Sequence, residues 1–211
     1  MSARPTREVA QSETDTLELV RRAQSGDLGS FNTLVIRYQD GAYSLALRFL
    51  GSRPAAEDVT QEAFIKAFRA IESFRGERFR SWLFSIVANL ARDELRRRKR
   101  RPQISIDRTR DDPDVATIEP QDPDPTPEAA LLSGELRETL ERALMQLPEE
   151  WRLVVVLSDV HGLSYDEIAD TLALRLGTVK SRLSRARGRM RDLLRATGEL
   201  SGGPERHRAG R

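Results

Sequence analysis

Apolar residues recur at three- and four-residue steps along most of this chain, and that period is typical of amphipathic α-helices. Polar and charged residues fill the positions between them, so each such segment has one face to bury. The pattern therefore predicts an all-α protein. The predicted helical segments are residues 17–49, punctuated by Gly26 and Gly41, and residues 54–71, 81–101, 132–147, 151–160 and 164–195.

The helical pattern stops after Pro102, which is followed by five more prolines up to Pro127. Residues 103–130 carry eight acidic side chains against two basic ones, and their apolar residues are scattered. Such a segment cannot bury enough apolar surface to fold, so we expect a flexible acidic linker between two small helical domains. The expected parts are a flexible tail (1–14), a first domain (15–101), the linker (102–130), a second domain (131–196) and a second flexible tail (197–211).

The second domain is predicted to end in a helix-turn-helix over residues 164–195. Ser164 and Glu167 have the spacing of a capping box, in which each side chain satisfies a free backbone donor at the start of the first helix. Gly177 is expected to close the turn, and Thr178 to cap the second helix. The buried stripe of the second helix is predicted to be Val179, Leu183, Ala186, Met190, Leu193 and Leu194.

The opposite face of that second helix combines small and basic residues. Residues 178–195 hold seven Lys or Arg residues against one Asp. Small side chains let the helix axis approach a major groove, while the cations reach base edges and phosphates. A solvated basic face on an ordinary helical bundle is the alternative. The small residues are Ser181, Ser184 and Gly188, and the flanking cations are Lys180, Arg185 and Arg191.

The end of the first domain interleaves aromatic and basic residues. Bases of single-stranded nucleic acid stack on such rings while cations hold the backbone. Each ring taken alone is also a good core residue, although Phe74, in a predicted loop, is the best candidate for an unburied one. The six consecutive cations from Arg96 to Arg101 favour phosphate contact. The block contains Phe74, Phe79, Trp82 and Phe84 with Arg75, Arg78 and Arg80, followed by a helical row of Ser85, Asn89, Arg92 and Arg96.

Three polar residues open the third predicted helix, Asp58, Gln61 and Glu62. They are expected on a face turned away from Phe64 and Phe68. On spacing alone, favourable electrostatics at a helix N-terminus is the favoured explanation, but spacing does not settle the question.

Composition argues against several classes of protein. The 211 residues carry a net charge of +2. Because they include no cysteine and only two histidines, we expect no disulfide, no metal site and no cofactor. The longest strongly apolar run, residues 153–157, is far too short for a membrane span. With no apolar signal segment at the N-terminus, we expect a cytoplasmic protein without membrane insertion. There is no phosphate-binding glycine motif and no nucleophile with an evident base, so no catalytic residue is predicted.

Two long stretches resemble a known family. They are DVTQEAFIKAFRAIESFRGERFRSWLFSIVANLARDELRRRKRR (58–101) and LPEEWRLVVVLSDVHGLSYDEIADTLALRLGTVKSRLSRAR (147–187). Together they resemble the extracytoplasmic-function sigma factors of bacteria, a branch of the sigma-70 family, over about residues 15–196. The resemblance implies that the first domain (region two) binds the clamp helices of the largest RNA polymerase subunit and melts the minus-ten promoter element. The last domain (region four) would read the minus-thirty-five element as duplex DNA.

The resemblance also assigns roles to residues and implies further partners. The linker would run toward the RNA exit path, the polymerase flap would be a second contact, and an anti-sigma factor would restrain the protein. Ala173 and Arg175 stand where the family often has Gly and Pro, and an alanine in a left-handed conformation there would cost about 1 kcal/mol. The implied residues are Asp58, Gln61 and Glu62 for polymerase, Phe74, Arg75, Phe79, Arg80, Asn89, Arg92 and Arg96 for minus-ten DNA, and Lys180, Ser181, Ser184 and Arg185 for minus-thirty-five DNA.

Two other functions were weighed against a sigma factor. A stand-alone helix-turn-helix regulator needs only residues 131–195 and predicts a dimer on paired half-sites, but it leaves the block from Phe74 to Arg101 unexplained. An enzyme is the other alternative, but the sequence contains no recognisable catalytic site.

Overall fold

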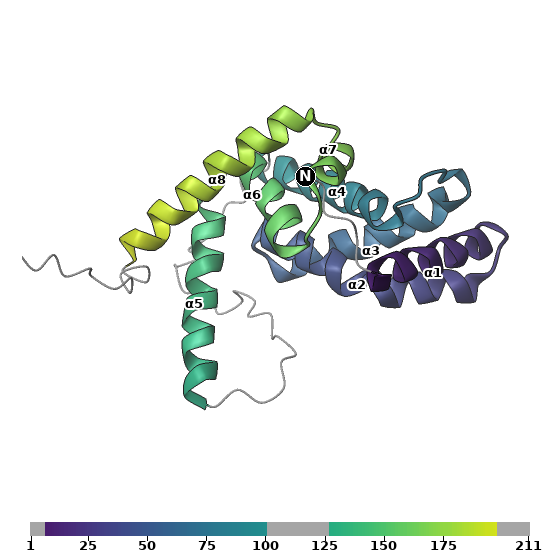
Figure 1. The fold of residues 1–211 in the computed structure, drawn as a ribbon, viewed down its shortest axis with the longest axis horizontal. Helices are drawn as coiled ribbons and strands as arrows, with labels where there is room; N and C mark the ends of the chain where they lie inside the picture. Colours follow the sequence, from purple (N-terminus) through teal and green to yellow (C-terminus); the bar gives the residue numbers. More distant parts are fainter. Residues whose placement is uncertain (1–6, 101–126, 198–211) are drawn as a thin grey trace, which may run out of the picture.

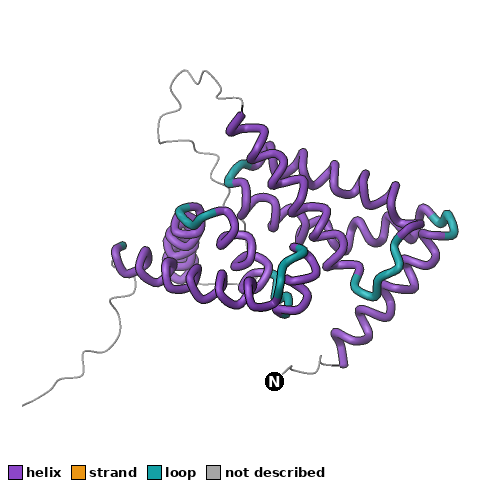
Figure 2. The backbone as a smooth tube through the Cα atoms, turned by 90° about the horizontal axis from the view of Figure 1, so that it is seen from above, coloured by secondary structure: helices purple, strands orange, loops and turns teal. Residues whose placement is uncertain are grey.

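The structure is a computed structural model that describes residues 7–100 and 127–197, and every element in those ranges is helical (Figures 1 and 2). The all-α prediction is confirmed. None of the helices in the described ranges is both long enough and apolar enough to cross a membrane. The elements are α1 (Arg7–Gln24), α2 (Leu28–Leu50), α3 (Arg53–Ala70), η1 (Ile71–Ser73), α4 (Phe79–Arg100), α5 (Pro127–Met145), α6 (Glu149–Val155), η2 (Val156–Val160), α7 (Tyr165–Leu172) and α8 (Leu176–Ala196).

Several boundaries differ from those expected. Helix α1 begins at Arg7, inside the stretch expected as a tail, and α5 begins at Pro127, inside the expected linker. Gly41 does not interrupt α2: a β-carbon at Gly41 would lie 3.3 Å from the Phe84 ring, so the glycine lets α2 and α4 pack closely. Residues 102–126 of the expected linker (102–130), and residues 1–6 and 198–211 of the expected tails (1–14 and 197–211), lie outside the described residues.

Helix α2 has a well-defined cap at each end. Asp27 accepts hydrogen bonds from the Ser30 hydroxyl (2.7 Å) and backbone N–H (3.2 Å), and pairs with Arg22. These interactions, led by the Ser30 hydroxyl, lower the pKa of Asp27 to about 2. At the other end Gly51 adopts a left-handed conformation (φ 66°) and donates to the Leu47 carbonyl. The polypeptide can therefore turn sharply from α2 into α3.

Helices α1–α4 form the first domain around buried residues such as Leu34, Leu45 and Leu83. Helices α5–α8 form the second, around residues such as Leu157 and Leu183. Helix α7 packs on α4, as Figure 1 shows, and the buried side chains of the two domains join in one continuous hydrophobic core. The two domains are therefore docked against each other.

Polar contacts also cross between the domains. Arg80 donates to the His161 carbonyl, and Arg152 donates to the Phe49 carbonyl at 2.8 Å. The His161 ring packs edge-on against Phe84 with centroids 4.9 Å apart. Burial, followed by the charges of Arg80 and Arg48, lowers the pKa of His161 to about 3, so the ring is neutral at physiological pH.

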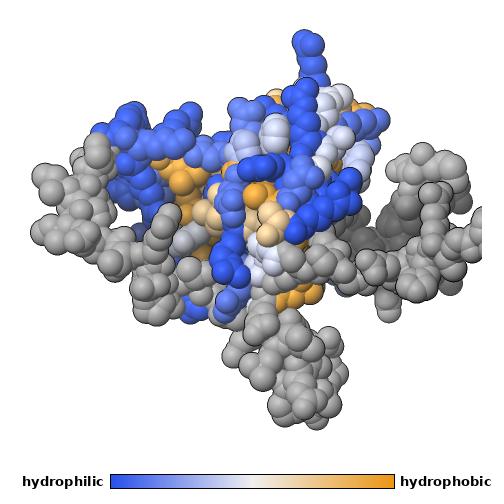
Figure 3. Space-filling model, turned by 90° about the vertical axis from the view of Figure 1, so that its left-hand side faces the viewer, coloured by the Kyte–Doolittle hydropathy of each residue, from blue (hydrophilic) through white to orange (hydrophobic). Residues whose placement is uncertain are grey.

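Helices α5 and α8 diverge where they project from the body (Figure 1). Along α5, Leu136, Leu140 and Met145 are exposed. Figure 3, seen from that end of the molecule, shows apolar side chains lying among charged ones.

Candidate nucleic-acid interface

The helix-turn-helix forms as predicted, with a different turn. The capping box is present, with Ser164 and Glu167 each bonded to the other's backbone N–H. Ala173 is left-handed (φ 52°, ψ 46°), which confirms the strained alanine expected there. The prediction for Gly177 and Thr178 was wrong, because α8 begins at Leu176 with Arg175 as its N-cap residue. The left-handed alanine reverses the chain early, so Gly177 and Thr178 lie in the first turn of α8.

The two faces of α8 are divided as the sequence predicted. Val179, Leu183 and Ala186 are buried, and Met190, Leu193 and Leu194 are half-buried. Lys180, Ser181, Ser184 and Arg185 are all exposed. Within the described residues, Lys180 and Arg185 form no ion pair or hydrogen bond, and the Ser181 hydroxyl bonds only to the Thr178 carbonyl. These four side chains form an open surface, which we call the α8 face.

Two other arginines of α8 are held inside the domain. Arg187 forms an ion pair with Asp159 and donates to the hydroxyls of Tyr165 (3.3 Å) and Ser158 (3.2 Å). The Asp159 hydrogen bonds raise the pKa of Arg187 further above its usual value. Arg182 pairs with Glu150 at 2.5 Å. Both arginines are among the seven basic residues of the predicted basic helix, and in the structure they fix α8 on α6, η2 and α7.

The loop between η1 and α4 is more closed than expected. Phe74 is only 7% exposed, so the prediction of an unburied ring was wrong. Its ring lies 4.9 Å from that of Trp82 and 6.0 Å from that of Phe79, centroid to centroid. A β-carbon at Gly76 would lie 3.0 Å from the Phe74 ring, so the glycine lets the loop fold over it. Phe79, which is 2% exposed, packs against the Phe74 and Trp82 rings on the side of the core.

The two arginines beside this cluster are engaged by backbone carbonyls. Arg75 donates to the carbonyls of Glu72 and Phe74. Arg80 lies 5.3 Å above the centroid of the Phe84 ring and donates to His161 in the other domain. Hydrogen bonds within the protein therefore already use part of each guanidinium.

The helical row of α4 shares one face, but its members differ in exposure. Ser85 is half-buried and bonds the Trp82 carbonyl, whereas Asn89 is fully exposed. Burial lowers the pKa of Arg92, and the nearby Arg182 of the second domain adds to this. Arg96 pairs with Asp93 on the surface. We call Arg80 and this row the α4 face.

The run of cations at the end of α4 is largely paired. Arg97 and Arg98 both contact Glu94, and Lys99 reaches Glu149 of α6 at 2.8 Å. These cations therefore have carboxylate partners within the protein, and the phosphate contact expected for the run stays a prediction. The Lys99–Glu149 pair is exposed and contributes little stability, so a phosphate can replace Glu149 at small cost, whereas Glu94 is only 13% exposed.

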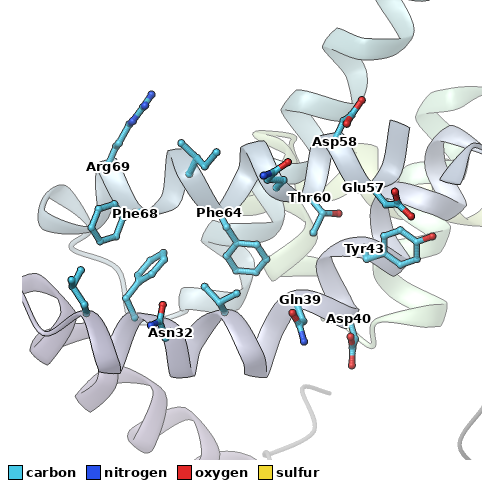
Figure 4. Close-up of a pocket in the computed structure, with 15 residues that line it drawn as sticks. Asn32, Gln39, Asp40, Tyr43, Glu57, Asp58, Thr60, Phe64, Phe68 and Arg69 are labelled. Atoms are coloured by element: carbon cyan, nitrogen blue, oxygen red, sulfur yellow. The ribbon is translucent and has the colours of Figure 1, made fainter. Parts of the chain in front are cut away.

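A groove of about 1200 Å³ lies between α2 and α3. Figure 4 shows Phe64 and Phe68 of α3 facing α2 across it, with Asp58 near one end and Arg69 near the other. Phe68 is 46% exposed. Asp58 and Gln61 line the same groove, so the expectation that they face away from Phe64 and Phe68 was wrong.

The other wall of the groove is formed by α2. The sequence analysis missed it, because only the packing of α2 against α3 brings these residues together. Glu62 is not part of the lining and pairs instead with Lys66 on the outer surface of α3 at 3.1 Å. The residues from α2 are Leu28, Phe31, Asn32, Val35, Gln39, Asp40 and Tyr43.

Two family models match this chain, in the order of the two domains. The model of sigma-70 region 2 matches residues 34–101, and that of sigma-70 region 4 matches residues 137–190. Both belong to one class of protein, the sigma-70 factors of RNA polymerase.

Curated relatives narrow the class. The RNA polymerase sigma-H factor of Pseudomonas aeruginosa is 41% identical over 81% of this chain and 89% of its own length. The ECF RNA polymerase sigma-E factor of Escherichia coli K12 is 42% identical over 80% of this chain and 88% of its own length. The chain belongs to the extracytoplasmic-function (ECF) sigma factors of the sigma-70 family.

Solved structures agree with this assignment. CnrH, solved with the cytosolic domain of CnrY, has a TM-score of 0.60 and 30% identity over 84% of this chain and 96% of its own. The sigma factor RpoE of Bartonella quintana, solved with the anti-sigma factor NepR, has a TM-score of 0.62 and 25% identity over 80% of this chain and 98% of its own.

Proposed function

We propose that this chain binds core RNA polymerase, directs it to promoters and holds the melted minus-ten strand during transcription initiation. The observation that carries the proposal is the open α8 face on a domain matched by region 4, in one chain with the aromatic loop and α4 face of a domain matched by region 2. A stand-alone regulator gives no role to residues 34–101. Promoter binding is a matter of affinity and assigns no chemical step to the chain.

The α2–α3 groove is the proposed polymerase contact. Its exposed Phe68 and Ile65 offer apolar surface, and Asp58 and Gln61 add polar groups at its edge. An amphipathic helix fits such a groove, because apolar anchors enter it while polar groups meet at its edges. By resemblance, that partner is the clamp-helix pair of the largest polymerase subunit. Glu62, on the outer side of α3, would meet the edge of the same partner.

The α8 face is the proposed reader of the minus-thirty-five element. Lys180 and Arg185 reach outward from a helix whose Ser181 and Ser184 leave room for close approach to the bases. Arginine and lysine match the acceptor edge of guanine in the major groove, and the serines accept or donate to several bases. Among the described residues, the one hydrogen bond of these four side chains is the local bond from Ser181 to the Thr178 carbonyl.

The aromatic loop and the α4 face are the proposed minus-ten site. Phe74 and Arg75 would stack on and hold an unstacked base, with Phe79 supporting the ring from within the core. Asn89, Arg92 and Arg96 would follow the strand along α4. Arg80 is bound to His161 and Arg92 lies near Arg182, so we infer that the second domain moves away from α4 when the strand is captured.

An anti-sigma factor is a further proposed partner. Both structural relatives described above were solved as complexes, and one of these partners is named as an anti-sigma factor. The polymerase flap is proposed to contact the second domain. With these partners, we propose that the chain acts in the bacterial cytoplasm.

The test combines the purified chain with sigma-free core polymerase. We expect the two to co-elute and to give transcripts from selected upstream regions of the source genome. Asp58→Arg should weaken co-elution, whereas Asp15→Arg, the same charge reversal on α1 and outside the groove, should not. Specific duplex binding by the chain alone, without polymerase association, would favour the stand-alone regulator.

A further inference from the structure

We propose that Gln24 is a positioning residue for the promoter-melting loop, an inference that rests on the proposed function. Gln24 is the last residue of α1, nearly fifty positions before the loop in the sequence. Its side-chain amide nitrogen donates to the Ile71 carbonyl at 2.9 Å and to the Phe74 carbonyl at 2.8 Å. The two N–H groups of this amide thus donate to the first and the last carbonyl of the turn that leads into the loop, those of Ile71 and Phe74.

The other hydrogen bonds of this turn are local. The Phe74 N–H bonds the Ile71 carbonyl at 3.1 Å, and Arg75 bonds the carbonyls of Glu72 and Phe74. These bonds shape the turn but do not attach it to the rest of the domain. Gln24 links the same carbonyls to α1, which is itself packed on α2. The amide therefore sets where the turn lies relative to the helical bundle.

The position of Phe74 depends on this link. The Phe74 carbonyl is one of the two acceptors, and its ring lies between Trp82 and the Gly76 backbone. A loop held in one position before DNA arrives loses less conformational entropy when it captures a base. Gln24 would act on promoter melting through Phe74, without touching DNA.

Gln24→Met tests this role, because methionine keeps the length and helix propensity of glutamine and removes both donors. The loss of this hydrogen-bonded link should lower the equilibrium extent of promoter opening about tenfold. Gln146→Met is the matched control: Gln146 is an exposed glutamine in the turn between α5 and α6. Opening is measured with full-length protein, core polymerase and a promoter carrying 2-aminopurine in the minus-ten element.

Three further measurements separate positioning from general instability. Polymerase affinity, duplex binding at the minus-thirty-five element and melting temperature should stay close to the wild-type values in Gln24→Met. In a Trp151→Phe background Trp82 is the only tryptophan, so its emission reports on the ring that contacts Phe74. We expect that emission to change in Gln24→Met and to stay unchanged in Gln146→Met.

The outcomes are distinct. Reduced opening together with a changed Trp82 emission, at unchanged polymerase affinity, supports the proposal. Wild-type opening by Gln24→Met overturns it, as does a loss that follows the melting temperature. If the wild-type protein binds polymerase but opens no promoter, the proposed function fails. In that case the Trp82 emission of the free chain still decides whether Gln24 positions the loop.

Discussion

The α8 face and the α4 face differ in how ready they are for DNA. Lys180 and Arg185 on α8 point into solvent without partners among the described residues. Arg80 and Arg92 on α4 are engaged by, or lie beside, the second domain. Under the proposed function, duplex recognition can therefore begin without breaking these contacts, whereas strand capture would first require the two domains to separate.

The difference arises from how each domain uses its arginines. In the second domain Arg182 and Arg187 fix α8 and leave the outward cations free. In the first domain, Arg80 lies over the Phe84 ring of its own helix and also donates a hydrogen bond to His161 of the other domain. On α8, partners within the protein thus separate the arginines that hold the helix in place from the outward cations that we propose as DNA contacts.

The largest effect on this comparison is expected from replacing Arg152, a buried residue of α6 that contacts both domains. Its guanidinium donates to the carbonyls of Leu144, Met145 and Leu147 and, across the interface, of Phe49. Arg152→Met should lower the free energy of unfolding by about 2 to 4 kcal/mol, because these buried acceptors lose their donor. Urea denaturation followed by circular dichroism measures the loss.

Arg142→Met is the control for that experiment. Arg142 is exposed on α5 and bonds only the Thr139 hydroxyl among the described residues. We expect a change within about 0.5 kcal/mol for this variant. A similarly small change for Arg152→Met would mean that the arginine is not the central link between the domains.

The next largest expected effect distinguishes the roles of two arginines of α8, Arg185 and Arg187. Arg185→Ala should weaken minus-thirty-five binding by the holoenzyme by roughly 1 to 3 kcal/mol, if its contact with a guanine is bidentate. Arg187→Ala should mainly lower the melting temperature, because it loses the Asp159 pair and two hydroxyl contacts. A binding assay at fixed salt and a thermal melt on both variants test the assignment. If Arg187→Ala weakened DNA binding and Arg185→Ala lowered the melting temperature, Arg187 would be the DNA contact and Arg185 the structural residue.

A lower pH should weaken the docking of the second domain on α4, because His161 is half-buried at that contact. The folded pKa of His161, about 3, lies below the usual 6.5, so the unfolded chain binds a proton that the docked form does not. Stability therefore falls as pH drops below 6.5, by at most about 1.4 kcal/mol per pH unit. Urea denaturation at pH 7.0 and pH 5.5 measures this, and separation of the domains should follow the same trend.

His161→Phe should remove that part of the pH dependence and keep the ring contact with Phe84. The comparison is made against this variant, because Glu141, whose pKa is raised by burial, changes stability in the opposite direction. Asp27 loses its contribution only as pH falls through about 2, below this window. An unchanged slope in His161→Phe would show that the histidine does not report on docking.

Local signals in the sequence predicted the helices and the capping box correctly. The apolar period, the Ser164–Glu167 spacing and the strained Ala173 are properties of neighbouring residues. The burial of Phe74 and the second wall of the α2–α3 groove depend on packing between distant helices. The same is true of the partners of Arg187 and of Gln24. These contacts carry no period or spacing of their own, so the sequence pattern did not reveal them, and Gly76 beside Phe74 was the one local hint.

The smallest predicted effect concerns the turn before α8. Ala173→Gly relieves the left-handed alanine, worth about 1 to 2 kcal/mol, but adds about 0.4 to 1 kcal/mol of backbone entropy to the unfolded chain. The net gain should be about 0.5 kcal/mol. Ala169→Gly, the same substitution inside α7, should instead cost about 1 kcal/mol. Opposite signs in urea denaturation would show that the turn, and not the helix, carries the strain. Because Ala173 leaves the α4 face untouched, promoter opening should not change in either direction.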